Sequence, residues 1–408
     1  MTNSPLELLA EKYNNKVLYD AEGNPSIFCE YPQVKSNWLD ASLPDHVHPA
    51  FIVNGTTDKS ALIGKYMAAE LASNGTLYSL PNMPPRVSLG HDPFRTRMTA
   101  FGGNVTGLTI ADHGLLLLMA HKNGWTPKGN NNYGVDYRDG SRFELNKAVT
   151  VGTKRVFRGW EYECLIAHTT SAELLPSETP THWRKGKHLG GEPVKTQYVA
   201  DNAYNGYNTL TGSGPASWYL GEDVGNIADP QGNAFEQVYG FRLVNCEIQI
   251  IPDNNAADPA CDTTANSAAW KAILPHASDN GYDLVAPGTP GTVHYAWLNG
   301  KITLVGRALE EAEFDGASRS TAFANIAVDS DTLPYVPYIL QELGLAPIPG
   351  MTVQGNFYVQ MTKDERVARR GGYSGNTSSA GLAYLGCSNA RGHAAVNYGG
   401  RPRSRPEA

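Results

Sequence analysis

The long stretch 124–240 limits what this chain can fold into, because it shows neither the period of an amphipathic helix nor that of a half-buried strand. It contains instead clusters of Gly, Asn, Trp and Tyr, such as Lys128–Gly134 and Asn202–Asn208. So many aromatic residues are not typical of disorder. Across the chain, 42 of 408 residues are glycine and 26 are proline, without the repeating period of collagen. We therefore expect a loop-rich globular protein in which 124–240 forms long ordered loops.

Regular elements are predicted where hydrophobic periodicity is bounded by turn residues. The clearest helix is 110–123, which stops at Gly124, and the clearest strand signal is 240–252, with a hairpin turn near Asn245. Further expected elements are a helix over 5–13, strands at 26–31, 49–54 and 61–67, helices at 268–274 and 334–343, and a strand pair at 356–360 and 366–370. The stretch 254–349 has the character of an insertion.

Neither a membrane span nor a secretion signal is readable. The longest apolar run, Leu115–Ala120, is far shorter than the roughly 20 residues of a transmembrane helix. The first residues lack a basic head followed by an apolar stretch, so we expect no signal peptide and synthesis in the cytosol. A chain of this length buries about three-quarters of its unfolded surface, so one large domain or two to three ordinary ones need no disulfide or structural metal.

The cysteines and histidines do not favour a metal centre. The five cysteines are scattered, odd in number and without a Cys-x-x-Cys motif, so we expect reduced, buried thiols. His46 and His48 would share one face of a strand, but two ligands without a third are a weak signal for a metal. Walker, dinucleotide-binding and nucleophile-elbow motifs are absent. We expect no cofactor and no metal.

The C-terminal end is basic although the chain carries a net charge of −7. Residues 361–408 contain eight Lys or Arg and three acidic residues. Such an end can bind nucleic acid or an anionic surface. Because these arginines alternate with glycines and form no block, we favour the interpretation that they hold loops in place by bidentate hydrogen bonds, and we expect no nucleic-acid partner.

Residues 366–401 alternate a hydrophobic framework with small or polar positions. Ala380, Leu382, Tyr384 and Leu385 can anchor a backbone. Between the anchors, side chains are expected to project at Tyr373, Asn376, Ser388, His393 and Asn397. A rigid scaffold with replaceable side chains is typical of a binding surface.

Four short motifs occur in order within this segment: Arg370-Gly371-Gly372, Ala380-Gly381-Leu382 with Leu385, Asn389-Ala390-Arg391, and Gly399-Gly400-Arg401. Together they resemble the variable region of diversity-generating retroelement variable proteins, a family that includes the major tropism determinant of a bacteriophage. The resemblance implies an α+β, C-type-lectin-like fold of the formylglycine-generating-enzyme type, loop-rich and with insertions. It implies an N-terminal helical segment at 1–24, then one lectin-like domain over 25–408, with the insertion at about 254–349 and the variable region at about 370–401.

Weaker matches lie upstream. Ile63–Tyr66 resembles an early strand of the family, and Asn130–Gly134 and Gly214–Trp218 resemble its gut-phage branch. Where the family has Gly-Asn-Val-Trp-Glu-Trp, this chain has Gly-Asn-Ala-Phe-Glu-Gln, so that Phe235 and Gln237 replace both tryptophans.

The resemblance implies a non-enzymatic, hypervariable protein that binds a host-surface protein or glycan receptor, on a phage tail and beside other virion tail proteins. A homotrimer is compatible with this role, because it would gain from avidity. The positions that match the family's diversified sites are Tyr373, Asn376, Ser379, Gly386, Ser388, Asn389, His393, Ala395 and Asn397. Tyr373 and His393 are expected to contribute most to affinity, because rigid aromatic and amphipathic side chains dominate recognition surfaces.

Two alternatives remain open. One is a structural virion protein whose C-terminus binds another tail component. The other is an enzyme of the formylglycine-generating type with altered chemistry, although those enzymes use two cysteines after Arg-Gly-Gly and here Cys387 stands alone. Calcium-dependent sugar binding is not supported, because neither Glu-Pro-Asn nor Trp-Asn-Asp occurs.

Overall fold

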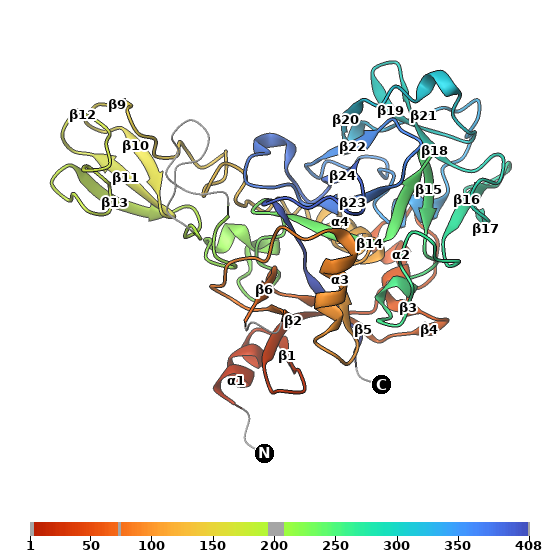
Figure 1. The fold of residues 1–408 in the computed structure, drawn as a ribbon, viewed down its shortest axis with the longest axis horizontal. Coiled ribbons are helices and arrows are strands. Elements are labelled where there is room, and N and C mark those ends of the chain that lie inside the picture. The colour runs from red at the N-terminus through yellow and green to blue at the C-terminus, as the bar shows by residue number, and fades with distance from the viewer. Residues whose placement is uncertain (1–3, 72–74, 195–207, 407–408) are drawn as a thin grey trace.

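The protein is described by a computed structural model over residues 4–71, 75–194 and 208–406. Figure 1 shows a large body that contains both chain ends and a small module that projects from it. The fold is sheet-rich with few helices, which confirms the coarser expectation of an α+β protein. No helix within the described ranges is long and apolar enough to cross a membrane. The α-helices are α1 (Pro5–Lys12), α2 (Ser36–Leu39), α3 (His91–Thr99), α4 (Ile110–Asn123) and α5 (Tyr338–Glu342).

The lower sheet of the body joins the two ends of the chain. Its strand order is β1-β2-β5-β26-β8, so the C-terminal strand β26 lies between two N-terminal strands. The N-terminal part of the chain also forms two short, separate hairpins, β3–β4 and β6–β7. The strands are β1 (Asn15–Tyr19), β2 (Pro25–Pro32), β3 (Ile52–Val53), β4 (Thr56–Thr57), β5 (Ser60–Gly64), β6 (Ala68–Glu70), β7 (Leu77–Ser79), β8 (Val105–Gly107) and β26 (Pro402–Ser404).

The upper sheet has twelve strands and carries the C-terminal motifs. Its main path is β20-β22-β24-β23-β14-β15-β18-β19-β21, with β16, β17 and β25 attached at the side. Strands from 254–349 therefore continue the sheet that β14 and β23 begin. Its strands are β14 (Phe235–Val244), β15 (Glu247–Ile250), β16 (Lys271–Pro275), β17 (Tyr282–Val285), β18 (His294–Leu298), β19 (Lys301–Val305), β20 (Ser318–Ala322), β21 (Ala327–Val328), β22 (Asn356–Gln360), β23 (Arg366–Arg370), β24 (Leu385–Asn389) and β25 (Tyr398–Gly399).

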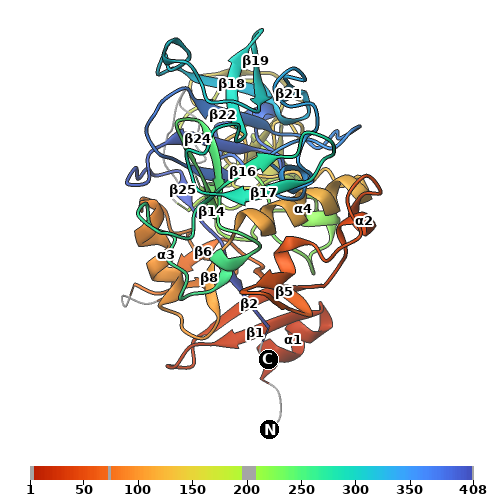
Figure 2. The ribbon, with the colours of Figure 1, turned by 90° about the vertical axis from the view of Figure 1, so that its right-hand side faces the viewer.

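Helix α4 lies between the two sheets (Figure 2). Thr109 and Asp112 form a capping box at its start, and Gly124 ends it in the left-handed conformation at φ 65°. Leu115–Leu118 are all buried, as expected of a helix that is apolar on every side. The helix predicted over 110–123 is therefore confirmed.

The projecting module contradicts the expectation of continuous loops over 124–240. It contains a three-stranded antiparallel sheet, β10-β11-β13, and the strand pair β9–β12 around a small core of Phe143, Phe157, Tyr162 and Trp183. At most other positions its strands carry exposed polar and charged side chains. The sequence of these strands therefore shows no clear alternation of hydrophobic and polar residues. They are β9 (Ala148–Val149), β10 (Lys154–Phe157), β11 (Trp160–Cys164), β12 (His168–Thr169) and β13 (Trp183–His188). Of the loop expected at 202–208, residues 202–207 lie outside the described residues.

Other expected elements have mixed outcomes. The helix at 5–13 and the strands at 26–31, 356–360 and 366–370 are confirmed, and the hairpin at 240–252 turns at Asn245 and Cys246. The helix at 268–274 is wrong, because Lys271–Pro275 pairs with β15 and β17 as a strand. At 49–54 a 3-10 turn, Pro49–Phe51, precedes the short strand β3. The helix expected at 334–343 forms only from Tyr338, after Pro337 at its N-cap.

Candidate functional site

A buried ionic cluster, defined as Glu236, Arg370 and Arg401, stabilises one side of the upper sheet. We call this side the inner side. Arg370 and Arg401 both pair with the Glu236 carboxylate, Arg401 through its Nε at 2.8 Å. Although burial alone raises it, the two arginines hold the pKa of Glu236 below its usual value. Arg401 also donates four hydrogen bonds of 2.9 to 3.1 Å to backbone carbonyls. These bonds tie the C-terminal end to the lower sheet.

Two further arginines near the C-terminus hold loops in place, as expected from their spacing. Arg391 donates two hydrogen bonds to the Glu365 carboxylate, at 2.8 and 2.9 Å, and Arg405 donates two to Asp58, both at 2.8 Å. Both are bidentate pairs that fix loops to the body. Most of the positive side chains at this end are therefore paired with groups of the same chain.

The opposite, outer side of the same strands carries a continuous strip of six rings. Side chains alternate along a strand, so the neighbours of the ionic cluster point outward. Phe235 lies at the centre, with ring centroids 5.1 Å from Tyr373, 5.3 Å from Tyr384 and 5.8 Å from Tyr398. The strip continues from Tyr384 to Tyr358 at 5.3 Å and from Tyr398 to His393 at 5.2 Å. We call this outer side, with loops 371–381 and 389–397, the display face.

The nine predicted binding residues fall on three segments of the display face. Gly386 and Ser388 lie on β24 and share the outward side with Tyr358 on β22. The remaining residues belong to its two loops or to the end of β24. They are Tyr373, Asn376 and Ser379 in the first loop, Asn389 at the strand end, and His393, Ala395 and Asn397 in the second loop. These side chains are half-buried, except for exposed His393 and buried Gly386.

Two of the nine also hold their own loop in shape. The Asn376 Oδ1 accepts a hydrogen bond of 2.8 Å from the Tyr373 amide, and the Ser379 Oγ donates one of 2.7 Å to the Asn376 carbonyl. The loop rests on the Asn130–Gly134 segment, where the Tyr133 amide donates to the Ser374 carbonyl at 2.9 Å. Substitution at Asn376 therefore affects loop geometry as well as the surface it presents.

The second loop is held through its backbone and through the Arg391 side chain. The Ala395 carbonyl accepts from Ser88 at 3.1 Å, and the Asn397 carbonyl accepts from Phe235 at 2.8 Å. The His393 side chain is exposed and rests against Tyr398. Because backbone groups make these two bonds, the side chains of His393, Ala395 and Asn397 are free to differ without breaking them.

Sequence reasoning missed four members of the strip: Phe235, Tyr358, Tyr384 and Tyr398. The sequence pattern predicts Tyr384 as a framework anchor, and this side chain is buried. The alternation in 356–360, with Phe357 and Val359 in the core, was the available signal that Tyr358 points outward. Phe235 and Gln237, where the chain departs from the resembled motif, both lie on the outer side of β14.

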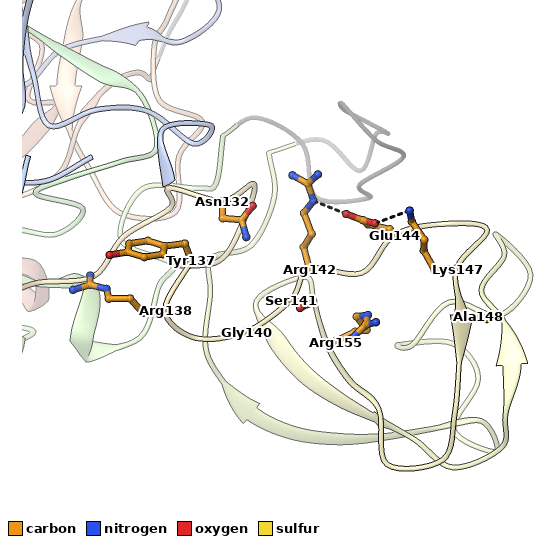
Figure 3. Close-up of a pocket in the computed structure, with 10 residues that line it drawn as sticks. All are labelled: Asn132, Tyr137, Arg138, Gly140, Ser141, Arg142, Glu144, Lys147, Ala148 and Arg155. Carbon is orange, nitrogen blue, oxygen red and sulfur yellow. Dashed lines mark hydrogen bonds and ion pairs between the residues drawn. The ribbon is translucent and has the colours of Figure 1, made fainter. Parts of the chain in front are cut away.

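A second surface of interest is a hollow of about 670 Å³ in the projecting module (Figure 3). Arg142, Lys147 and Arg155 line it around one carboxylate, Glu144. Glu144 pairs with Arg142 at 3.1 Å and with Lys147 at 3.5 Å. The lining is therefore positive overall, and the chemistry suits an anion.

The two histidines considered as metal ligands have other roles. His46 lies on no strand, and its Nε2 is 2.5 Å from the buried Glu342 carboxylate, while the His48 Nε2 is 3.1 Å from the Glu342 carbonyl oxygen. The hydrogen bond that His46 donates to the Glu342 carboxylate raises the pKa of His46, and burial lowers the pKa of His48. Within the described part of the chain, no three His, Cys, Asp or Glu side chains are grouped to hold a metal.

All five cysteines are free thiols. Cys387 is fully buried on the core side of β24. Burial raises its pKa, so the thiol stays protonated and is a weak nucleophile.

Comparison with known proteins adds no assignment, since no family model and no curated protein matches this chain.

Proposed function

We propose that this chain is a non-enzymatic ligand-binding protein diversified by a retroelement, that its C-type-lectin-like scaffold presents the display face, and that it serves as a receptor-binding or tail-fibre protein of a phage virion. The observation that carries the proposal is the position of the nine predicted residues. They were chosen from sequence motifs alone, and they lie on three segments around one strip of aromatic rings.

The composition of the display face supports recognition. Tyr and His rings provide rigid contact area, and Ser and Asn provide adaptable hydrogen bonds, which is the mixture found in antibody-like binding surfaces. The ionic cluster on the inner side holds the same strands without using any of the nine residues. A surface of this kind accepts new side chains while its support stays constant.

The buried, protonated thiol of Cys387 supports a non-enzymatic role over an oxidase. The related chemistry needs two reactive cysteines, and the other four thiols lie elsewhere in the chain. An oxygen-consumption assay with a thiol substrate tests this part directly, and turnover would contradict it.

The encoding locus tests the proposal most cheaply. We expect a near-repeat of the segment for 370–401 beside a reverse-transcriptase gene, differing from it only opposite template adenines. The absence of such a repeat would refute diversification. Binding of the purified protein to host cells, compared with binding to purified tail proteins, then separates a receptor-binding protein from a structural virion protein.

A further inference from the structure

Two adjacent arginines of β23 are both buried, yet they differ in their partners. Arg370 points to the inner side and pairs with Glu236. Arg369 points to the outer side and is 2% exposed, and none of its three guanidinium nitrogens has a hydrogen-bond partner among the described residues. A guanidinium that loses its water without gaining an acceptor is costly to bury.

The surroundings of Arg369 compensate this charge only in part. The Tyr398 ring covers the guanidinium, with its centroid 3.9 Å from Cζ, which is a cation–π contact. In the sheet register Gln237 lies beside Arg369 on the same side, and its Oε1 also lacks a hydrogen-bond donor within the described ranges. Burial lowers the pKa of Arg369, and the largest charge interactions that oppose this shift come from Tyr398, Cys387 and Tyr384.

We propose that Arg369 is an anion-binding residue at the base of the display face and that it pairs with a carboxylate on an acidic side chain of a protein ligand. The inference rests on the proposed function, because it describes the ligand that the display face binds. Arg369 is outside the nine predicted variable positions, so it would give every variant of the surface the same anchor point.

Geometry and chemistry favour this ligand. The guanidinium presents a planar fork of donors that matches a carboxylate in a bidentate pair. Because Arg369 lies beneath Tyr398, the incoming group must be carried on a narrow, flexible chain, as in Glu or Asp, and must shift the Tyr398 ring. The rings and hydroxyl groups around it are typical of surfaces that bind proteins.

A thermal-shift titration of the full chain tests the site without knowledge of the ligand. The probes are acetate and N-acetylglutamate, compared with glucuronate and inorganic phosphate at equal ionic strength. We expect acetate and N-acetylglutamate to raise the Tm, since a ligand at about 10 times its Kd favours the native state about 11-fold. Arg369→Met should lose this response.

The stability of the free protein provides the matched comparison. Without probe, Arg369→Met should keep or raise the Tm, because it removes a charge without an acceptor, whereas Arg370→Met should lower the Tm strongly. A clear fall in Tm for Arg369→Met would indicate a purely structural role and would overturn the inference.

A second variant tests the same site independently of the loss of Arg369. Gln237→Glu places a carboxylate beside Arg369, so it should raise the Tm and abolish the response to acetate. An unchanged acetate response in Gln237→Glu, or a response to glucuronate alone, would contradict an acidic side chain as the ligand group.

The two proposals fail in different ways. A carboxylate response that depends on Arg369, found in a chain whose locus has no repeat and whose face binds no partner, would refute the proposed function and leave the site intact. A diversified locus and a binding face without any carboxylate response would refute the inference alone.

Discussion

The two sides of the upper sheet carry the same kinds of residue and treat them differently. On the inner side Arg370 and Arg401 share Glu236, and His113 Nδ1 and backbone carbonyls accept hydrogen bonds from their other nitrogens. On the outer side Arg369 and the Gln237 Oε1 have no hydrogen-bond partner among the described residues. The difference teaches that one strand, by simple alternation, can fasten the scaffold with one side and hold buried polar groups without hydrogen-bond partners on the other.

Removing the shared carboxylate should have the largest effect. Glu236→Gln leaves two buried arginines without a counter-charge, so we expect the free energy of unfolding to fall by about 3–5 kcal/mol. Denaturant titration with circular dichroism measures this change. A loss well under 1 kcal/mol would show that the ionic cluster does not hold the scaffold.

A glycine of the framework motifs and a glycine at a predicted variable position should respond differently to a methyl group. A Cβ at Gly381 would lie 1.9 Å from the Gln354 carbonyl oxygen, whereas a Cβ at Gly386 would meet only the Tyr384 ring, at 3.3 Å. We expect Gly381→Ala to cost about 1–3 kcal/mol or more, and Gly386→Ala much less. Equal losses in the two variants, measured by thermal unfolding, would remove the distinction between framework and variable glycine.

Acid should weaken the inner side through His113. Burial, with Arg370 nearby, lowers the pKa of His113, so the native state holds it neutral while the unfolded chain binds a proton below its ordinary pKa of 6.5. Stability is therefore complete above this value and falls as the pH decreases, by about 1.4 kcal/mol per pH unit for such a group. His113→Asn should flatten this part of the pH profile, and an identical slope in both proteins would argue against the assignment.

Side chains of the display face should matter least for stability. Asn376→Ala removes the hydrogen bond that shapes its loop and should cost about 1 kcal/mol, while His393→Ala should stay within about 0.5 kcal/mol. Chemical denaturation of the two single variants provides the comparison. If His393→Ala were the more damaging substitution, the second loop would depend on its side chains rather than on its backbone bonds.

The sequence predicted the display face better than the module. The framework motifs bring the nine residues onto three segments around one strip of rings, and the role of these residues in binding stays a prediction. The module's strands, such as Trp183–His188 with its run of exposed charged residues, have too little buried surface for a visible period. The sequence also could not predict that Arg369 is buried without a hydrogen-bond acceptor. Whether a buried arginine finds an acceptor depends here on Gln237 and Tyr398, which are far from it in sequence or on another strand.

The helix expected at 268–274 failed for a similar reason. Lys271–Pro275 is a strand because β15 and β17 offer backbone partners on both of its sides. Such tertiary pairing overrides local propensity, and nothing within the segment itself reports it.

The central claim is that the display face varies independently of the scaffold that carries it. Two libraries test it by the fraction of members that keep the parent's resistance to protease. One library randomises the nine predicted positions, and the other randomises nine framework positions: Arg370, Gly372, Ala380, Gly381, Leu382, Tyr384, Leu385, Cys387 and Arg401. We predict that most members of the first library remain folded and that few of the second do. Equal folded fractions in the two libraries would contradict the account.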